Sequence, residues 1–117
     1  MIAPEFAKDF ATHWIAAWNS HNLQQVLSHY ADDFEMSSPY IAQIAGEPSG
    51  ILKGKKAVAA YWAVALQKMP NLRFEHVQTL TGVDSVTIYY RGVRGMAAEV
   101  FFFNSEGLVV TACAHYE

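Results

Sequence analysis

The chain has only one cysteine, Cys113, so it can form neither an internal disulfide nor a cysteine-rich zinc site. Charged residues make up only 16% of the sequence, and the lysines and arginines form no basic stripe of the kind that binds nucleic acid. No apolar run approaches membrane-spanning length, and the first residues lack the basic and apolar stretches of a signal peptide. We therefore expect a cytoplasmic protein without nucleic-acid or membrane partners.

Cofactor and metal motifs are also missing. The five histidines do not fall at a metal-ligand spacing, and the sequence has no nucleophile elbow, phosphate loop or dinucleotide fingerprint. We therefore predict no metal and no cofactor, so that any catalysis by this chain would use acid–base side chains.

Apolar residues, by contrast, are abundant. They make up 52% of the 117 residues, and aromatic residues make up 14%. A length of 117 residues fits one domain, residues 1–117, with a single core. So small a monomer has little volume in which to bury this much apolar surface. We expect the surplus both to line an internal cavity and to cover a subunit interface, and hence a homodimer.

The first part of the chain has helical periodicity. Phe6, Phe10, Trp14 and Trp18 recur every four residues and would form one aromatic stripe along a helix. Asn22 can cap a short second helix, and a third follows a stretch rich in glycine and proline. The predicted helices span residues 4–19, 23–30 and 55–69.

The rest of the chain is rich in β-branched and aromatic residues separated by turn signals. Helices followed by a meander of strands predict an α+β fold, with the helices on one face of a curved antiparallel sheet. Between the first strand and the third helix, residues 39–54 could form a loop or a short hairpin over the mouth of a pocket. The predicted strands span residues 34–38, 72–81, 85–91, 96–104 and 108–116.

Glu99 stands out within the strand 96–104. Strand alternation places it on the same face as Phe101 and Phe103, and a carboxylate among aromatic rings should have a raised pKa. Carboxyl groups with shifted pKa values are enriched at functional sites. The alternative is a glutamate at the sheet margin that reaches solvent or an arginine.

Four segments together resemble the nuclear transport factor 2-like superfamily, which includes SnoaL-type polyketide cyclases and ketosteroid isomerases. They are residues 14–23, residues 26–36 followed by Pro39, residues 54–62 and residues 101–109. The resemblance implies a cystatin-like roll, in which a cone-shaped, bent antiparallel sheet wraps around three N-terminal helices. It also implies an open end to the cone and dimerisation through the outer sheet face.

The resemblance does not extend to the isomerase chemistry, in which an Asp base acts with an oxyanion hole made of a Tyr and a protonated Asp. The tyrosine position on the first helix is matched by Trp14, and the base position by Ser38, which cannot act as a carboxylate base. Glu99 matches the second oxyanion-hole position. Steroid isomerase activity is therefore not expected.

Two functions remain open. The first is a SnoaL-like pocket that binds a small apolar molecule, with Glu99 as an acid or base in an isomerisation, cyclisation or dehydration of a carbonyl compound. The second is a non-catalytic binding or dimerisation module of the same fold. For the pocket, the predicted ligand-binding residues are Trp14, Trp18, Tyr30, Ser38, Trp62, His76, Phe101 and Tyr116.

Overall fold

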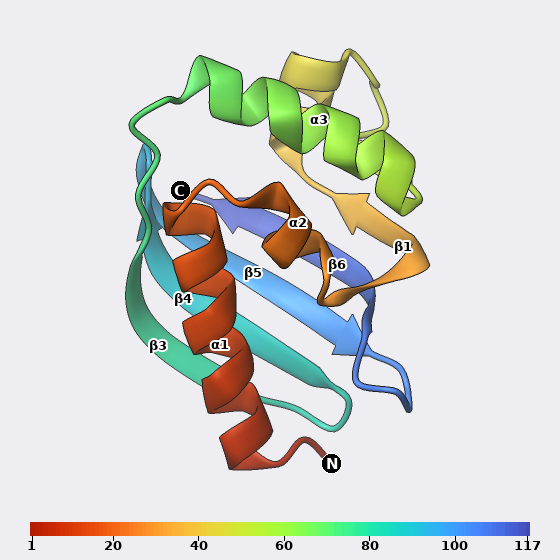
Figure 1. Cartoon of the computed structure of the whole chain (residues 1–117), viewed down its shortest axis with the longest axis vertical. Helices are drawn as coiled ribbons and strands as arrows, with labels where there is room; N and C mark the ends of the chain where they lie inside the picture. The colour runs from red at the N-terminus through yellow and green to blue at the C-terminus, as the bar shows by residue number, and fades with distance from the viewer.

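The computed structural model describes all residues, 1–117, and contains helices on one face of a six-stranded sheet (Figure 1). The first helix, α1, lies across strands β3 to β5, and α3 lies over the other end of the sheet, near β1. The helical elements are α1 (Pro4–Asn19), α2 (Leu23–Leu27), the π-helix η1 (Ile41–Ala45) and α3 (Lys55–Lys68). This arrangement confirms the predicted α+β roll.

The aromatic stripe of α1 faces the sheet. Phe10, Trp14 and Trp18 are buried, whereas Phe6 remains 36% exposed at the start of the helix. Phe10 and Trp14 both contact Phe101 of the sheet, edge to face, with ring centroids 4.8 and 5.2 Å away. Since such aromatic contacts combine large buried area with a preferred geometry, they fix how α1 lies on the sheet.

The second helix is shorter than predicted. It covers Leu23–Leu27, and Asn22 caps it by accepting a hydrogen bond from the Gln25 backbone N–H at 3.1 Å. Tyr30, expected at the end of this helix, instead begins the first strand and pairs with Val109. Local periodicity could not reveal this pairing, because the partner strand lies at the far end of the chain.

The sheet order is β2-β1-β6-β5-β4-β3. All neighbouring strands are antiparallel except β1 and β6, which are parallel. Such a pair needs a long connection, which β2, α3 and the strands β3 to β5 provide here. The predicted antiparallel sheet thus has one parallel pair. The strands are β1 (Tyr30–Ser37), β2 (Ile51–Lys53), β3 (Glu75–Thr81), β4 (Ser85–Gly92), β5 (Gly95–Phe103) and β6 (Val109–Tyr116).

Residues 39–54 form a short hairpin rather than an irregular loop. Strand β2 pairs with β1 in antiparallel register, and η1 lies between the two strands. Gly46 ends η1 with a φ of 73°, in the left-handed region that favours glycine. This hairpin carries Tyr40, which reaches the site described below.

The two faces of the sheet differ in burial. Val86, Ile88 and Tyr90 of β4 point toward the helices and are buried, as are Ala97, Glu99, Phe101 and Phe103 of β5. The intervening Tyr89 and Phe102 lie on the outer face, 40% and 36% exposed. None of the helices has the length and apolar character needed to cross a membrane.

Candidate functional site

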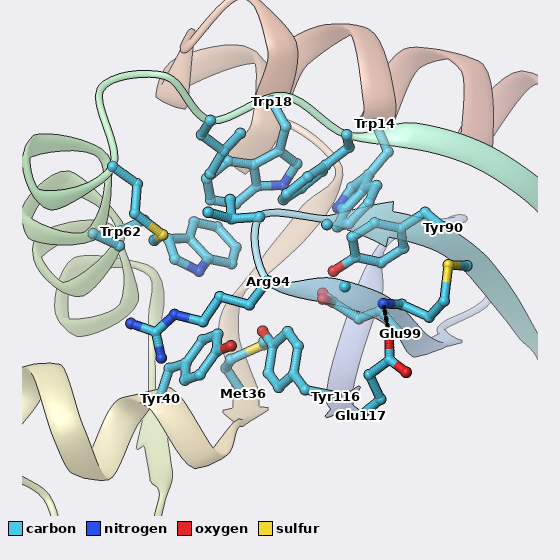
Figure 2. A pocket seen from close by; sticks show the side chains of 18 of the residues that line it. Trp14, Trp18, Met36, Tyr40, Trp62, Tyr90, Arg94, Glu99, Tyr116 and Glu117 are labelled. Carbon is cyan, nitrogen blue, oxygen red and sulfur yellow. Dashed lines mark hydrogen bonds between the residues drawn. The ribbon is translucent and has the colours of Figure 1, made fainter.

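A partly enclosed cavity of about 70 Å³ lies between α1, α3 and the inner face of the sheet (Figure 2). Of its 19 lining residues 14 are hydrophobic, so that its wall is mainly apolar. The lining side chains include Trp14, Trp18, Met36, Tyr40, Tyr61, Trp62, Met69, Phe74, Tyr90, Arg94, Glu99 and Tyr116.

Glu99 is the buried carboxyl group of this cavity. Strand β5 places it between Ile88 of β4 and Ala114 of β6, and the residue is only 4% exposed. Its side chain forms no salt bridge and no hydrogen bond within the chain. Burial therefore raises its pKa to about 8. At neutral pH Glu99 is mostly a neutral acid that can donate a hydrogen bond to a molecule in the cavity.

Four tyrosines surround Glu99. Burial raises the pKa values of Tyr30, Tyr61, Tyr90 and Tyr116, and the negative charge that Glu99 carries when ionised raises them further. For Tyr61 the pKa reaches about 12. All four phenols are therefore neutral wherever Glu99 titrates, and each keeps a proton with which to donate a hydrogen bond.

Ser38 lies at the edge of this ring of phenols. It is 4% exposed, and its hydroxyl oxygen accepts a hydrogen bond from the Tyr40 backbone N–H at 3.2 Å. Hydrogen bonding to Ser38 partly offsets the rise in the pKa values of Tyr61 and Tyr116. Ser38 thus orients phenols instead of presenting itself to the cavity.

The tryptophans of α1 differ in what their indole N–H groups do. Trp14 donates to the Tyr30 phenol oxygen at 3.0 Å, inside the core. The Trp18 N–H is buried and has no acceptor in the chain. An unpaired buried donor is unfavourable by about 1–3 kcal/mol, so Trp18 gains if an acceptor oxygen comes within reach.

At the mouth, an arginine and two tyrosines lie against one another. Tyr40 stacks on Tyr116, with ring centroids 4.2 Å apart and an interplanar angle of 23°. The guanidinium carbon of Arg94, from the turn between β4 and β5, lies 5.1 Å from the centroid of the Tyr40 ring. Figure 2 shows the Arg94 side chain extending across the opening toward Tyr40.

The cavity brings together five of the nine residues that the sequence suggested: Trp14, Trp18, Trp62, Glu99 and Tyr116. Three others lie behind its wall. Tyr30 accepts the hydrogen bond from Trp14, Ser38 is turned toward the phenols, and Phe101 packs in the core against Phe10 and Trp14. These three support the lining side chains without lining the cavity.

His76 lies elsewhere. It belongs to β3, where it pairs with Tyr90, but it is exposed and lines a separate groove between α1 and β3. Its Nε2 lies 2.6 Å from the Thr79 Oγ1. A register irregularity between His76 and Gln78 shifts this end of β3, which the alternation of residues in the sequence does not show.

Sequence reasoning missed several lining residues, notably Tyr40, Tyr90 and Arg94. Tyr90 had a usable signal because it alternates in register with the buried Val86 and Ile88. Tyr40 and Arg94 had none. They come from a π-helical hairpin and a tight turn, whose meeting at the mouth depends on the folding of the whole sheet.

The structure contains no group of three or more His, Cys, Asp or Glu side chains that could hold a metal ion. The polar groups that line the cavity are the Glu99 carboxyl group and the tyrosine phenols, which are groups able to form hydrogen bonds with a ligand.

Residues 11–117 match the family model of the SnoaL-like domain. The chain belongs to the SnoaL-like family. A SnoaL-like protein of unknown function from Burkholderia thailandensis has 58% identity and a TM-score of 0.95, with 99% of this chain and 98% of that one covered. No curated protein matches this chain.

More distant solved structures share the fold. A candidate isomerase of the SnoaL-like family from Agrobacterium tumefaciens has a TM-score of 0.73 at 19% identity, over 94% of this chain and 96% of that one. A candidate polyketide cyclase from Sinorhizobium meliloti has a TM-score of 0.72 at 12% identity, over 92% and 94%. At these identities the likeness establishes a SnoaL-like and nuclear transport factor 2-like fold.

Proposed function

We propose that this SnoaL-like protein binds a small, largely apolar carbonyl compound in its cavity, where Glu99 transfers a proton to or from it. The observation that carries the proposal is the position of Glu99, a buried carboxyl group on an aromatic wall with no partner in the chain. Burial is unfavourable for the ionised form of such a group, which loses its hydration, and carboxyl groups perturbed in this way are enriched at functional sites.

With a pKa of about 8, Glu99 can act either as an acid or as a base near neutral pH. Below about pH 8 it is mainly protonated and can donate a hydrogen bond, or its proton, to a carbonyl oxygen. Above that pH it is mainly a carboxylate and can take a proton from the carbon next to the carbonyl. Isomerisation, aldol-type cyclisation and dehydration of a carbonyl compound all need such transfers.

The size of the cavity limits what it can hold. Its volume of about 70 Å³ is roughly half that of an engineered cavity of about 150 Å³ that binds benzene. A ligand as large as a six-membered ring therefore extends into the mouth, where the exposed residues Val93 and Arg94 lie. Extended polycyclic substrates fit poorly, which agrees with Ser38 replacing the base of the steroid isomerases.

Two further observations support a carbonyl compound as the ligand. The neutral phenols of Tyr61 and Tyr90, which line the cavity, offer hydrogen-bond donors to a ligand oxygen. Proteins of the same fold have been described as a candidate isomerase and a candidate polyketide cyclase. Polyketide cyclisation and many isomerisations are reactions of carbonyl compounds.

Proton transfer can be tested with cyclohexanone, by following by NMR the exchange of its α-hydrogens for deuterium in heavy water. We expect the protein to accelerate this exchange over buffer, with a rate that rises through about pH 8 as Glu99 ionises. Glu99→Gln should lose the acceleration, whereas the exposed Glu106→Gln should keep it. Equal rates in wild type and Glu99→Gln would contradict a catalytic role for Glu99.

The outer sheet face favours a second function, dimerisation with another copy of the chain. Leu80, Tyr89, Val100 and Phe102 lie on this face, opposite the helices, and three of them are exposed. An exposed apolar stripe of this kind on a small chain is typical of a subunit interface. Sedimentation at micromolar concentration should give a dimer for the wild type and a monomer for Phe102→Lys. A wild-type monomer would rule out this interface.

A further inference from the structure

Arg94 is the only cation among the residues that line the cavity. It lies in the two-residue turn between β4 and β5, is exposed, and reaches across the mouth to Tyr40 (Figure 2). A cation–π contact with the Tyr40 ring holds the guanidinium there, 5.1 Å from the ring centroid.

No carboxylate neutralises Arg94. The single salt bridge of the chain joins Lys55 to Asp32, and the Arg94 side chain donates no hydrogen bond to any other residue. Its five N–H donors are therefore unpaired within the chain, while the cation–π contact keeps the guanidinium beside the Tyr40 ring. A planar fork of free donors is the geometry that recognises a carboxylate.

The other charged groups at the cavity do not compete for this position. Glu99 lies deeper and is mostly neutral at neutral pH. Glu117 is engaged elsewhere, since its Oε1 accepts a hydrogen bond from the Met96 backbone N–H at 2.6 Å. Figure 2 shows the guanidinium of Arg94 next to Tyr40 and Glu117 on the opposite side of the opening.

The cavity thus has an apolar interior, and its rim carries the cation of Arg94 on one side and the carboxylate of Glu117 on the other. A ligand with more than a few heavy atoms must extend from the interior to this rim, because the interior holds only about 70 Å³. We propose that Arg94 binds an anionic group, such as a carboxylate, on a ligand whose apolar carbonyl-bearing body lies in the cavity. This inference rests on the proposed function and narrows its substrate class from neutral carbonyl compounds to small amphipathic keto acids.

The test compares two probes of nearly the same shape, 3-oxocyclohexanecarboxylate and its neutral carboxamide. Binding is followed by the fluorescence of the three tryptophans, all of which line the cavity. The rings of Trp18 and Trp62 lie 5.1 Å apart. We expect wild-type protein to bind the carboxylate about three- to tenfold more tightly than the carboxamide at low salt. Added salt should reduce this ratio, because the pair is solvent-exposed.

Arg94→Gln should bring the ratio close to one. Arg91→Gln is the matched control: Arg91 is also exposed on the β4–β5 hairpin, but it does not line the cavity, and its variant should keep the wild-type ratio. Equal binding of the two probes by the wild type, or a preference that survives Arg94→Gln, overturns the role of Arg94 and leaves the proposed function standing. Binding of neither probe counts against both.

Discussion

Trp14 donates its indole N–H to the phenol oxygen of Tyr30 across 3.0 Å, within the core beneath the cavity. This bond ties α1 to the start of β1. Trp14 occupies the position that matches the oxyanion-hole tyrosine of the ketosteroid isomerases. Its N–H, however, already has a partner inside the protein and is not left for a ligand. The donors left for a ligand are therefore protonated Glu99 and the phenols that line the cavity, so only the Glu99 position is shared with the steroid enzymes.

Removing the Tyr30 hydroxyl should destabilise the fold. Tyr30→Phe leaves the Trp14 N–H buried without an acceptor, so we expect a loss of about 1–3 kcal/mol in the free energy of unfolding, measured by urea denaturation. The same change at Tyr89, which lies exposed on the outer sheet face, should cost less than about 0.5 kcal/mol. Equal losses for the two variants would show that the Trp14–Tyr30 bond contributes no stability.

Glu99 should make the protein less stable as the pH rises. Its pKa is about 8 in the folded protein, against about 4.3 when unfolded, so between these values the folded state holds a proton that the unfolded state has released. The unfolding free energy should fall by about 1.4 kcal/mol per pH unit in this range from this group alone. Glu99→Gln removes that contribution, so its stability relative to wild type should increase steadily from about pH 5 to about pH 8.

Urea titrations at several pH values in this range would measure that difference. Glu106 lies on the exposed turn before β6, so the unfolding free energy of Glu106→Gln should change with pH as that of the wild type does. A constant difference between Glu99→Gln and wild type at every pH would mean that Glu99 has an ordinary pKa, and general-acid chemistry would lose its basis.

Gly50 should tolerate a side chain less well than Gly46. Both have positive φ, 72° and 73°, so alanine at either position should cost about 1–2 kcal/mol from backbone strain. At Gly50 a Cβ would also lie 3.2 Å from the Ser38 carbonyl oxygen, whereas at Gly46 nothing lies within 4 Å. Gly50→Ala should therefore lower the midpoint of thermal unfolding more than Gly46→Ala does. Equal decreases would mean that the backbone near Ser38 shifts to accommodate the new Cβ.

Replacing Asn19 should weaken ligand binding in the cavity as well as lower the unfolding free energy. Its side chain donates to the Phe74 carbonyl oxygen at 2.9 Å and accepts from the Phe74 N–H at 2.6 Å, which holds this lining residue against Trp14. Asn19→Ala should lower the unfolding free energy by about 1–3 kcal/mol and weaken cyclohexanone binding. Asn71→Ala, at an exposed position, is the control. Full binding by Asn19→Ala would show that Phe74 needs no such anchor.

Much of the fold could be predicted from the sequence because the relevant signals are local. The four-residue aromatic spacing of α1 and the alternation along β5 each depend on a repeat of fixed period, and they correctly predict that Trp14, Trp18 and Glu99 lie on inward faces. The same reasoning extends the second helix to Tyr30 and points His76 at a cavity that it does not reach. Both differences arise from pairing with other strands, which local periodicity does not encode.

Residue patterns alone were thus enough to predict an α+β fold with helices on one face of a curved sheet and with the aromatic residues and Glu99 on inward faces, and the family resemblance added the roll. Which groups face that cavity, and in what protonation state, depends instead on packing between segments that are distant in the chain. The wrapping of the sheet buries Glu99 away from any partner and raises its pKa to about 8, so it becomes an acid that can transfer a proton near neutral pH. It also brings Arg94 from one hairpin over Tyr40 from another, which places a cation at the opening of the apolar cavity.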